Sequence, residues 1–459
     1  MSDTIAAVST LMGRSAIGIL RMSGDDAIEI AEKVFKPDNG RALGECGTRR
    51  MINGQFYGEN GEVIDQCVAV FCRAPHSYTG ENTVELQCHG SPTVLTAGLR
   101  SLFKAGARQA TRGEFTKRAF LNGKLDLAQS EAVIDLIDAE TEEMMRNAAA
   151  QLGGAMSDRM DAIYSGLTDI MSHFHAVIDY PDEDIDPFEA ENVIATLGST
   201  AAEISQLLKT FERGRVVREG VRCAIIGRPN AGKSSLLNAL LGYDRAIVTD
   251  IPGTTRDTIE EKLMLGGVML RLADTAGLRE TVDIVEQMGV ERARAAAENA
   301  ELVFALFDGS APLTADDEAV ISGAAAAKHA IAIVNKNDLG YALSADDEAR
   351  LNEAFGGFCR ISAKQSVGLD ALEAAVEDIF RDNAPVPAGE MITNERQAHA
   401  LRRALDGVTR AADALSIGLT PDAVLTDVEE AMSAIGEISG RTIRDDITSR
   451  IFERFCVGK

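Results

Sequence analysis

Five short motifs in this 459-residue chain contain side chains that could bind and cleave a nucleoside triphosphate. The first, Gly227 to Ser234, fits G-x-x-x-x-G-K-[ST], a loop whose backbone N–H groups face phosphate oxygens. Lys233 would reach the β- and γ-phosphates, and the Ser234 hydroxyl would ligate Mg²⁺. An apolar run at 221–226 precedes the motif and a helical pattern at 235–241 follows it, which is the strand–loop–helix context that phosphate binding requires.

The other four motifs follow in the order that a guanine-nucleotide switch requires. The segment 249–257 is similar to a switch I loop, in which Thr255 would be the second Mg²⁺ ligand. Asp274 to Gly277 would supply an outer-sphere carboxylate and an N–H group that senses the γ-phosphate. In the motif Asn335 to Asp338, the Asp338 carboxylate can accept hydrogen bonds from guanine N1–H and the exocyclic amine, which adenine lacks there. The last motif, Ser362 to Lys364, would complete the base pocket. The predicted GTP contacts are Asn230, Ala231, Gly232, Lys233, Ser234, Ser235, Thr249, Asp250, Ile251, Pro252, Gly253, Thr254, Thr255, Asp274, Thr275, Ala276, Gly277, Asn335, Lys336, Asp338, Ser362, Ala363 and Lys364.

The group that orients the attacking water must differ from that of Ras-type GTPases. Their glutamine position is Leu278 here, and a leucine side chain cannot orient water. The acids just downstream are Glu280, Asp283 and Glu286, although each is equally explained as a solvated acid at a helix start. Lys233 and Arg256 complete the predicted catalytic set.

The surrounding sequence predicts a multidomain chain of α/β and all-α parts. Residues 1–120 combine predicted strands at 16–22, 67–73 and 82–88 with helices at 25–35 and after Pro92. Long amphipathic helices follow, with Gly153-Gly154 between the first two. Strands and helices then alternate, which predicts a doubly wound, mostly parallel sheet. Helical periodicity resumes after a linker at 382–389, so the nucleotide domain is expected as an insertion in a helical domain. The predicted domains are 1–120, 121–217, 218–380 and 381–459.

Composition limits the possible compartments and partners. Hydrophobic residues make up 45% of the chain, and no apolar run reaches the roughly 18 residues of a membrane span. The N-terminus lacks signal-peptide features, and the seven irregularly spaced cysteines fit reduced thiols in a cytoplasm. The net charge of −25, from 71 acidic and 46 basic residues, repels nucleic acid unless a local basic patch exists.

One basic run could form such a patch. Between residues 100 and 124 the only acid is Glu114. A solvated helix face explains the run as well as an RNA contact does. Its cations are Arg100, Lys104, Arg108, Arg112, Lys117, Arg118 and Lys124.

Four segments resemble the MnmE family of tRNA-modification GTPases, also called TrmE, and the resemblance covers nearly the whole chain. They are 227–238, 274–280, 118–129 and the C-terminal 455–459. The resemblance implies a tetrahydrofolate-binding N-terminal domain that forms a homodimer, a central helical domain and an inserted Ras-like P-loop GTPase domain. Ser15 and Ser91 stand in loops near the implied folate site, at positions where the family more often has glycine.

The same resemblance implies roles for individual residues. During hydrolysis, K⁺ would take the place of an arginine finger between two approaching G domains. Glu286 matches the family's water-orienting acid. Cys456 is a possible functional thiol, although a buried inert thiol explains it equally well. The implied K⁺ ligands are Asn230, Thr249, Ile251 and Thr254, and the implied contacts to methylene- or formyl-tetrahydrofolate are Arg21, Glu85, Lys124 and Lys459.

The function implied is that of a cytoplasmic, K⁺-stimulated GTPase in tRNA modification. With an FAD-dependent MnmG-type partner, in a heterotetramer, it would add an aminomethyl or carboxymethylaminomethyl group to C5 of the wobble uridine of certain tRNAs. The alternative is a GTP-dependent RNA-binding switch in ribosome assembly. That class would carry a basic domain after the nucleotide domain, where this chain has an acidic helical segment.

Overall fold

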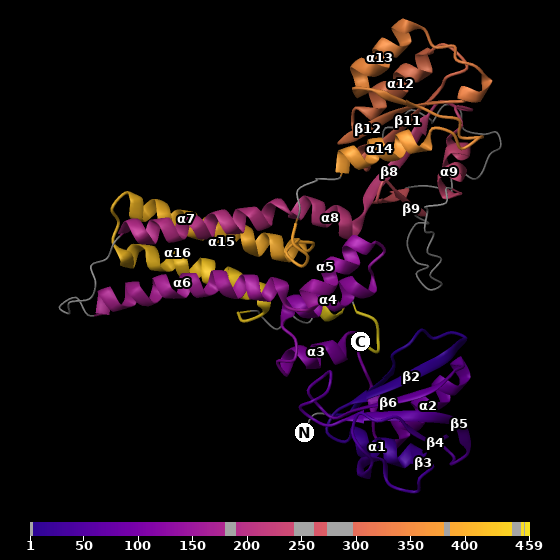
Figure 1. Ribbon diagram of the computed structural model, residues 1–459. Helices are drawn as coiled ribbons and strands as arrows, with labels where there is room; N and C mark the ends of the chain where they lie inside the picture. Colours follow the sequence, from indigo (N-terminus) through magenta and orange to yellow (C-terminus); the bar gives the residue numbers. More distant parts are fainter. Residues whose placement is uncertain are drawn as a thin grey trace.

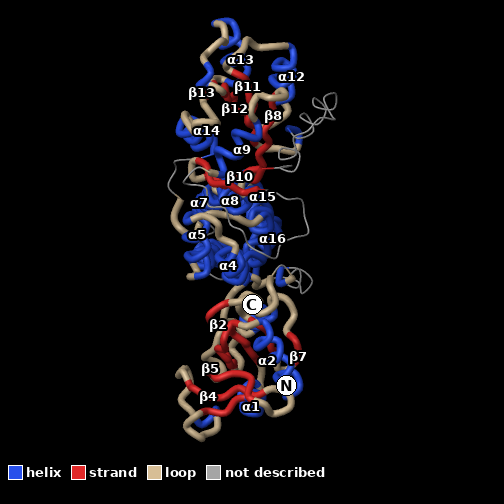
Figure 2. The backbone as a smooth tube through the Cα atoms, turned by 90° about the vertical axis from the view of Figure 1, so that its right-hand side faces the viewer, coloured by secondary structure: helices blue, strands red, loops and turns tan. Residues whose placement is uncertain are grey.

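The computed structural model describes residues 3–179, 190–242, 261–272, 297–380, 386–442, 451–453 and 455–459. Its elements form a seven-stranded sheet at one end, a helical bundle in the middle and a six-stranded sheet at the other end, stacked along one axis (Figures 1 and 2). This arrangement confirms the predicted multidomain α/β and α architecture.

The first sheet has the strand order β3-β4-β5-β6-β2-β1-β7 and is antiparallel except between β1 and β7. Helices α1 (Ala27–Val34) and α2 (Pro92–Ala105) share the sheet's hydrophobic core. Val84, Leu86 and Cys88 are buried in that core, as their alternation predicts. The strands are β1 Ile5–Val8, β2 Ser15–Ser23, β3 Phe35–Pro37, β4 Ile52–Tyr57, β5 Val63–Cys72, β6 Thr83–Gly90 and β7 Arg108–Gln109, and a 3₁₀ helix spans Leu43–Glu45.

The predicted buried strand at 16–22 is buried on one face only. Leu20 and Met22 lie in the core, whereas Ile17 is 57% exposed. Arg21 also points to the outer face of the sheet, where its partner Glu85 lies directly across on β6. The exposed face is therefore available for a ligand or another chain.

The helical bundle is built from two separate parts of the sequence. Residues from 128–211 and from 392–438 share one hydrophobic core, in which Leu167, Leu401 and Ile435 are fully or almost fully buried. The nucleotide-type sheet is thus inserted between the two helical parts, as predicted. The helices are α3 Glu114–Leu121, α4 Leu127–Ile137, α5 Glu142–Leu152, α6 Ala155–Asp179, α7 Ala190–Lys209, α8 Phe211–Glu219, α15 Glu395–Ser416 and α16 Pro421–Ser439.

Two helix breaks were not predicted. The helix expected before Gly153 is interrupted between α4 and α5, where the Thr141 side chain accepts a hydrogen bond from the Met144 N–H and caps α5. A second break separates α7, which ends at Lys209, from α8, which begins at Phe211. Thr210 lies at that break, and its hydroxyl accepts from the Ile392 N–H, so the break connects the two parts of the bundle.

The second sheet has the order β13-β12-β11-β8-β10-β9 and is parallel except between β9 and β10. Helices α9 and α14 share a core on one face, and α12 and α13 share a core on the other. This is the doubly wound, mostly parallel sheet that the sequence predicts. The elements are β8 Val221–Gly227, α9 Lys233–Leu241, β9 Glu261–Leu265, β10 Val268–Leu272, β11 Leu302–Asp308, α12 Ala315–Ala324, β12 His329–Asn335, a 3₁₀ helix Asn337–Leu339, α13 Ala345–Phe355, β13 Phe358–Arg360 and α14 Leu369–Phe380.

The C-terminal segment returns to the first sheet, beside which the C-terminus is labelled in Figure 1. The Gly113 N–H donates to Cys456 O at 3.3 Å, and the Phe115 N–H donates to Lys459 O at 3.1 Å. The Ser9 hydroxyl donates to Gly458 O at 3.0 Å. These contacts place the last residues of the chain beside residues of its first domain.

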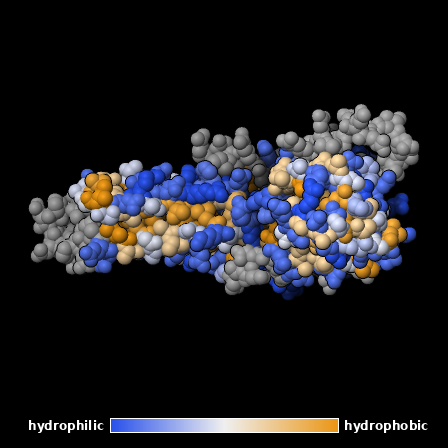
Figure 3. All heavy atoms as spheres, turned by 90° about the horizontal axis from the view of Figure 1, so that it is seen from above, coloured by the Kyte–Doolittle hydropathy of each residue, from blue (hydrophilic) through white to orange (hydrophobic). Residues whose placement is uncertain are grey.

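Hydrophilic side chains run along the bundle and interrupt its apolar groups when the molecule is seen from above (Figure 3). Among the helices that the structure describes, none is long and apolar enough to cross a membrane.

Candidate functional sites

The P-loop joins β8 to α9 at the carboxyl edge of the parallel sheet. Gly232 caps α9 with φ +104°, and a Cβ at this position would lie 2.3 Å from Asn335 Nδ2. Only glycine fits there without displacing Asn335. The N–H groups of the first turn of α9 therefore face the loop, as an anion site at a helix N-terminus requires.

Lys233 lies over the P-loop that it follows. Its Nζ donates to Gly227 O at 2.8 Å and to Arg228 O at 3.0 Å, and burial lowers its pKa. Both acceptors are loop carbonyls, so the ammonium group is held above the loop where phosphate oxygens would bind. The position fits the predicted contact with the β- and γ-phosphates.

Asn335 connects the P-loop to the loop that contains Ser362 and Ala363. Its Nδ2 donates to Ala231 O at 3.0 Å, and its Oδ1 accepts from the Ala363 N–H at 2.9 Å. The side chain is 2% exposed. Sequence reasoning placed Asn335 among the nucleotide contacts, whereas its amide here holds two nucleotide-binding loops together.

Asp338 is the predicted guanine acceptor. Its carboxylate accepts from the Ser362 hydroxyl at 2.7 Å, and this hydrogen bond holds the pKa of Asp338 below its usual range. The carboxylate is therefore ionised at neutral pH and fixed beside Ser362 and Lys364, the loop predicted to complete the base pocket. This is the protonation state that would accept two donors from guanine.

Two charged residues at this edge were missed by the sequence analysis. Asp308, the last residue of β11, accepts from Lys336 Nζ at 2.7 Å, and Arg228 Nη2 lies 3.6 Å from the same carboxylate. Although burial raises the pKa of Asp308, hydrogen bonds from Lys336 and Ser310 lower it overall. The only available signal was the position of Asp308 at a strand end, at the edge that carries the motifs.

Of the remaining predicted nucleotide residues, three lie in the described part of the chain and the others lie outside it. Ser234 and Ser235 lie in the first turn of α9, next to Lys233. Asn230 is exposed in the P-loop, with φ +61°. Outside the described residues lie Thr249, Asp250, Ile251, Pro252, Gly253, Thr254, Thr255, Arg256, Asp274, Thr275, Ala276, Gly277 and Glu286.

The side chains at the P-loop offer oxygen ligands, which suit hard cations that are also bound by phosphate. Those that the structure describes do not form a metal site made of protein ligands alone. Within the described ranges, no group of three or more His, Cys, Asp or Glu side chains could hold a metal ion. Ser234 and Asn230 offer a hydroxyl and an amide oxygen beside the loop, which are ligands that Mg²⁺ and K⁺ accept together with phosphate oxygens. The residues present therefore fit the predicted ions.

In the first domain, the predicted folate residue Arg21 lies beside Glu85 and two aromatic rings. Arg21 Nε donates to Glu85 Oε1 at 2.8 Å, and its guanidinium carbon lies 5.8 Å from the ring centres of both Tyr78 and Phe115. The N–H of Phe115, on α3, donates to Lys459 O, so the C-terminal residue lies against α3. Sequence reasoning missed both aromatic residues, which lie far from Arg21 along the chain.

Lys124 lies beside the loop that contains Tyr78, because its side chain packs against Gly80. A Cβ on Gly80 would lie 3.3 Å from Lys124 Cγ, and Gly80 is two residues after Tyr78. Arg21 therefore contacts this loop at Tyr78 and Lys124 contacts it at Gly80, while Lys459 contacts α3 at Phe115. Cys456 is exposed beside them and has no disulfide partner.

The basic run from 100 to 124 is not a free patch. Arg108 and Arg118 are both ion-paired with Asp3 and Glu114. Arg118 is only 8% exposed and also pairs with Glu81. Neither of the two explanations considered from the sequence, an RNA contact or a solvated face, describes Arg118.

Comparisons with known proteins agree with this geometry. The family "GTP-binding protein TrmE N-terminus" matches residues 4–124, and "MnmE helical domain" matches residues 127–456. A tRNA modification GTPase MnmE from Symbiobacterium thermophilum is 43% identical over 459 residues, covering 100% of this chain and 99% of the relative.

Two further relatives bear the same name. One from Alkaliphilus metalliredigens is 41% identical over 463 residues, covering 100% of both chains, and one from Roseiflexus sp. is 43% identical over 465 residues, covering 100% of this chain and 99% of the relative. Among solved structures, the G domain of the T. maritima FeoB iron transporter matches 35% of this chain and 99% of that chain at 21% identity, with a TM-score of 0.25, too low to support a conclusion. On the full-length matches, this chain belongs to the MnmE family of tRNA modification GTPases.

Proposed function

We propose that this chain is a K⁺-stimulated, Mg²⁺-dependent GTP hydrolase that modifies C5 of the wobble uridine of certain tRNAs. It acts in the cytoplasm as a homodimer, in a heterotetramer with an FAD-dependent MnmG-type partner, and takes a one-carbon unit from a tetrahydrofolate bound to its first domain. We further propose the domain limits 1–120, 121–217, 218–380 and 381–459 and the site residues predicted from the sequence.

One observation carries the proposal. The P-loop and the loops of Asp338 and Ser362 meet at one edge of a parallel sheet, joined by Asn335, in a chain that matches MnmE relatives along its full length. The ribosome-assembly alternative expects a separate basic domain after this sheet. Instead, α15 and α16 complete the helical bundle with α6 and α7.

The chain's own residues have defined tasks in hydrolysis. Backbone N–H groups at the start of α9 and the Lys233 ammonium bind the phosphates and neutralise charge that develops on the γ-phosphate. Glu286 orients the attacking water, since Leu278 cannot. When bound beside Ser234 and Asn230, Mg²⁺ and K⁺ supply further positive charge at the phosphates.

The first domain would bind the folate. The Glu85 carboxylate suits the amidine-like edge of the pterin, and the cations Arg21, Lys124 and Lys459 suit the carboxylates of the glutamyl tail. Arg21 is already paired with Glu85, so folate binding would need these two groups to share or exchange partners.

The decisive test is steady-state GTP hydrolysis in KCl and in NaCl at equal ionic strength. We expect a large stimulation that is specific to KCl, and a strong preference for GTP over ATP. Equal rates in both salts would refute the K⁺ site and the hydrolysis mechanism that depends on it.

Base recognition can be tested separately with Asp338→Asn. An amide presents a donor where guanine N1–H needs an acceptor, so GTP affinity should fall about 100-fold or more while xanthosine triphosphate affinity rises. Asp346→Asn, an exposed change on α13, is the matched control and should alter neither affinity. Unchanged base preference in Asp338→Asn would contradict the assigned base pocket.

A further inference from the structure

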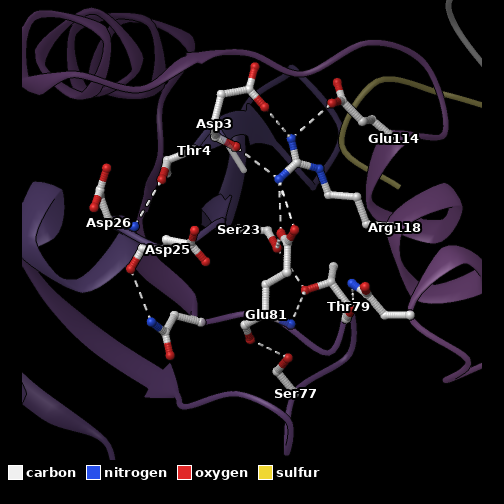
Figure 4. Close-up of polar contacts among 12 residues, drawn as sticks. Asp3, Thr4, Ser23, Asp25, Asp26, Ser77, Thr79, Glu81, Glu114 and Arg118 are labelled. Atoms are coloured by element: carbon white, nitrogen blue, oxygen red, sulfur yellow. Dashed lines mark hydrogen bonds and ion pairs between the residues drawn. The ribbon is translucent and has the colours of Figure 1, made fainter. Parts of the chain in front are cut away.

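A buried cluster of charges lies at the loop that joins β5 to β6. Arg118, on α3, is 8% exposed. Its Nη1 donates to the two carboxylate oxygens of Glu81 at 2.9 and 3.2 Å, and its Nη2 donates to Asp3 at 2.9 Å and to Glu114 at 3.1 Å (Figure 4). Both terminal nitrogens of Arg118 are thus engaged with protein groups, which favours a structural role over direct ligand binding.

Glu81 fixes the end of the loop on its other side. The Ser23 hydroxyl donates to Glu81 Oε2 at 2.7 Å and lies 2.7 Å from the Thr79 hydroxyl oxygen. That same Thr79 oxygen accepts from the Glu81 N–H at 3.2 Å. Figure 4 shows these groups as one connected network, in which the Arg118–Glu81 pair joins the loop to α3.

Two more contacts attach the loop to α3 and the residues just after it. Tyr78 Oη lies 2.9 Å from the Thr116 hydroxyl oxygen, and Asn122 Nδ2 donates to Thr79 O at 2.7 Å. The loop is therefore attached at Tyr78, at Thr79 and at Glu81. Of these attachments, only the one at Glu81 is a charged pair, in which Arg118 Nη1 lies within hydrogen-bond distance of both carboxylate oxygens, and charge-assisted hydrogen bonds are stronger than neutral ones.

The loop held in this way lies between the proposed folate residues. The Tyr78 ring lies 5.8 Å from the Arg21 guanidinium, and Gly80 lies against the Lys124 side chain. A shift of the loop would change the positions of both cations relative to each other. Displacements of about 1 Å are enough to weaken a preorganised site severely.

We propose that Arg118 is a positioning residue for the folate site: through Glu81 it holds residues 77–82 so that Tyr78 packs on Arg21 and Gly80 packs on Lys124. This inference depends on the proposed function of the first domain. It assigns Arg118 and Glu81 to setting folate affinity, although the folate touches neither side chain.

The test measures binding of 5-formyltetrahydrofolate to the full-length protein by titration calorimetry. Glu81→Gln keeps the size of the side chain and removes its charge, whereas Arg118→Lys keeps the charge and replaces the guanidinium by a single ammonium, so both weaken the hydrogen bonds of the pair. We expect each to reduce folate affinity roughly tenfold or more, with unchanged affinity for a non-hydrolysable GTP analogue.

Arg108→Lys is the matched control. Arg108 pairs with the same Asp3 and Glu114 carboxylates, and among the described residues its side chain also donates to Gln109 O but to no residue of the 77–82 loop. It should change folate affinity less than about twofold, which separates loop positioning from the general stability of the charge cluster. Loss of affinity in Arg108→Lys equal to that in Arg118→Lys would overturn the proposal.

A double variant distinguishes positioning from a direct contact. Tyr78→Phe removes the hydrogen bond between the Tyr78 and Thr116 hydroxyl groups and so loosens the 77–82 loop. If Arg118 acts through the loop, Tyr78→Phe/Arg118→Lys should lose less affinity than the product of the two single losses. Multiplicative losses, or wild-type affinity in Glu81→Gln, would overturn the inference. Absence of folate binding to the wild-type protein would instead refute the proposed folate function.

Discussion

At the scale of single residues, Asn335 illustrates how a nucleotide site is assembled before any nucleotide binds. Its amide satisfies one carbonyl of the P-loop and one N–H of the Ala363 loop. Ala231 and Ala363 are buried as well, so neither backbone group could form a hydrogen bond with water instead. The side chain therefore holds the phosphate-binding and base-binding loops at a fixed separation.

Asn335→Ala should weaken both the fold and the site. Two polar backbone groups would be left without a partner, at a cost of about 1–3 kcal/mol each in the free energy of unfolding. GDP affinity should fall about tenfold or more, because the two loops separate. Urea unfolding and nucleotide titration check both effects. Asn352→Ala, an exposed position on α13, should leave both quantities unchanged.

The sequence identified residues of the functional sites only where those residues belong to a motif with fixed spacing. Gly232 and Lys233 belong to one motif, and Asp338 belongs to another that follows it in a known order. Because each motif comes directly after a strand, a parallel sheet brings both to the same carboxyl edge. Asp308 and Tyr78 belong to no motif. Their contacts with Lys336 and Arg21 depend on strand pairing and on a loop whose path is set by distant residues.

At the scale of elements, apolar periodicity predicted most helices but not where they end. The interruption between α4 and α5 needs the Thr141 cap, and the interruption between α7 and α8 lies at Thr210, which binds the Ile392 N–H. A side-chain cap is a local signal that competes with an unbroken apolar pattern. The second break depends on Ile392, which is 182 positions from Thr210 in the sequence, so no local signal could reveal it.

Helix α3 gives a prediction about pH. Partial burial raises the pKa of Glu114, but hydrogen bonds from Arg108, the Thr111 N–H and Arg118 lower it overall to about 2. The folded-state pKa is therefore below the ordinary value of 4.5. The stability contributed by this carboxylate is present above about pH 4.5 and is lost as the pH falls toward 2.

Glu114→Gln should reveal that contribution in urea unfolding at several pH values. The wild-type protein should exceed the variant by about 1 kcal/mol in free energy of unfolding at pH 7, after allowance for solvent screening. The difference should shrink toward zero as the pH falls from about 4.5 to 2. A difference that stays constant over this range would show that the Glu114 carboxylate is not linked to folding.

At the scale of the whole molecule, the chain forms its bundle from both sides of an inserted domain and then returns to the first sheet. The insertion was predictable, because helical periodicity stops and resumes around the nucleotide motifs. The return of residues 455–459 to the first domain does not follow from periodicity, and the sequence implied it only through the family resemblance, which gives Lys459 as a folate contact. The contacts that hold this segment are two backbone hydrogen bonds, to Gly113 and Phe115, and one hydrogen bond from the Ser9 hydroxyl, and none of them belongs to a recognisable motif.

The inserted domain is joined to the bundle through the junction of α8 and β8. Gly220 alone separates the two elements, and β8 leads directly into the P-loop. Arg215 on α8 pairs with Glu301 at 2.6 Å, and Lys262 pairs with Glu140 at 2.6 Å. A cavity of about 560 Å³ lies in this interface, lined by α8, the β9–β10 turn and α14. A change at the P-loop could therefore reach the bundle along β8.

Gly220→Ala tests whether this junction couples the two domains. Gly220 has φ +71°, and a Cβ there would lie 2.8 Å from Met269 O, so the methyl group must displace β10 from the junction. Gly356→Ala is the control for a glycine with positive φ, since Gly356 is left-handed (φ +72°, ψ 0°) and no described atom lies within 4 Å of the added Cβ. Gly220 has ψ 178°, a conformation that is nearly restricted to glycine, so Gly220→Ala adds a larger backbone strain of about 1–3 kcal/mol as well as the clash.

If hydrolysis drives modification through this junction, Gly220→Ala should lose more tRNA modification than GTP hydrolysis. The rates of both reactions would be measured on the complex with the FAD-dependent partner, and modification per GTP hydrolysed should fall several-fold relative to Gly356→Ala. Hydrolysis requires only groups within the nucleotide domains, whereas modification requires their rearrangement to reach the rest of the molecule. An equal ratio in the two variants would mean that the two activities are coupled by another route, such as direct contact between a nucleotide domain and the partner protein.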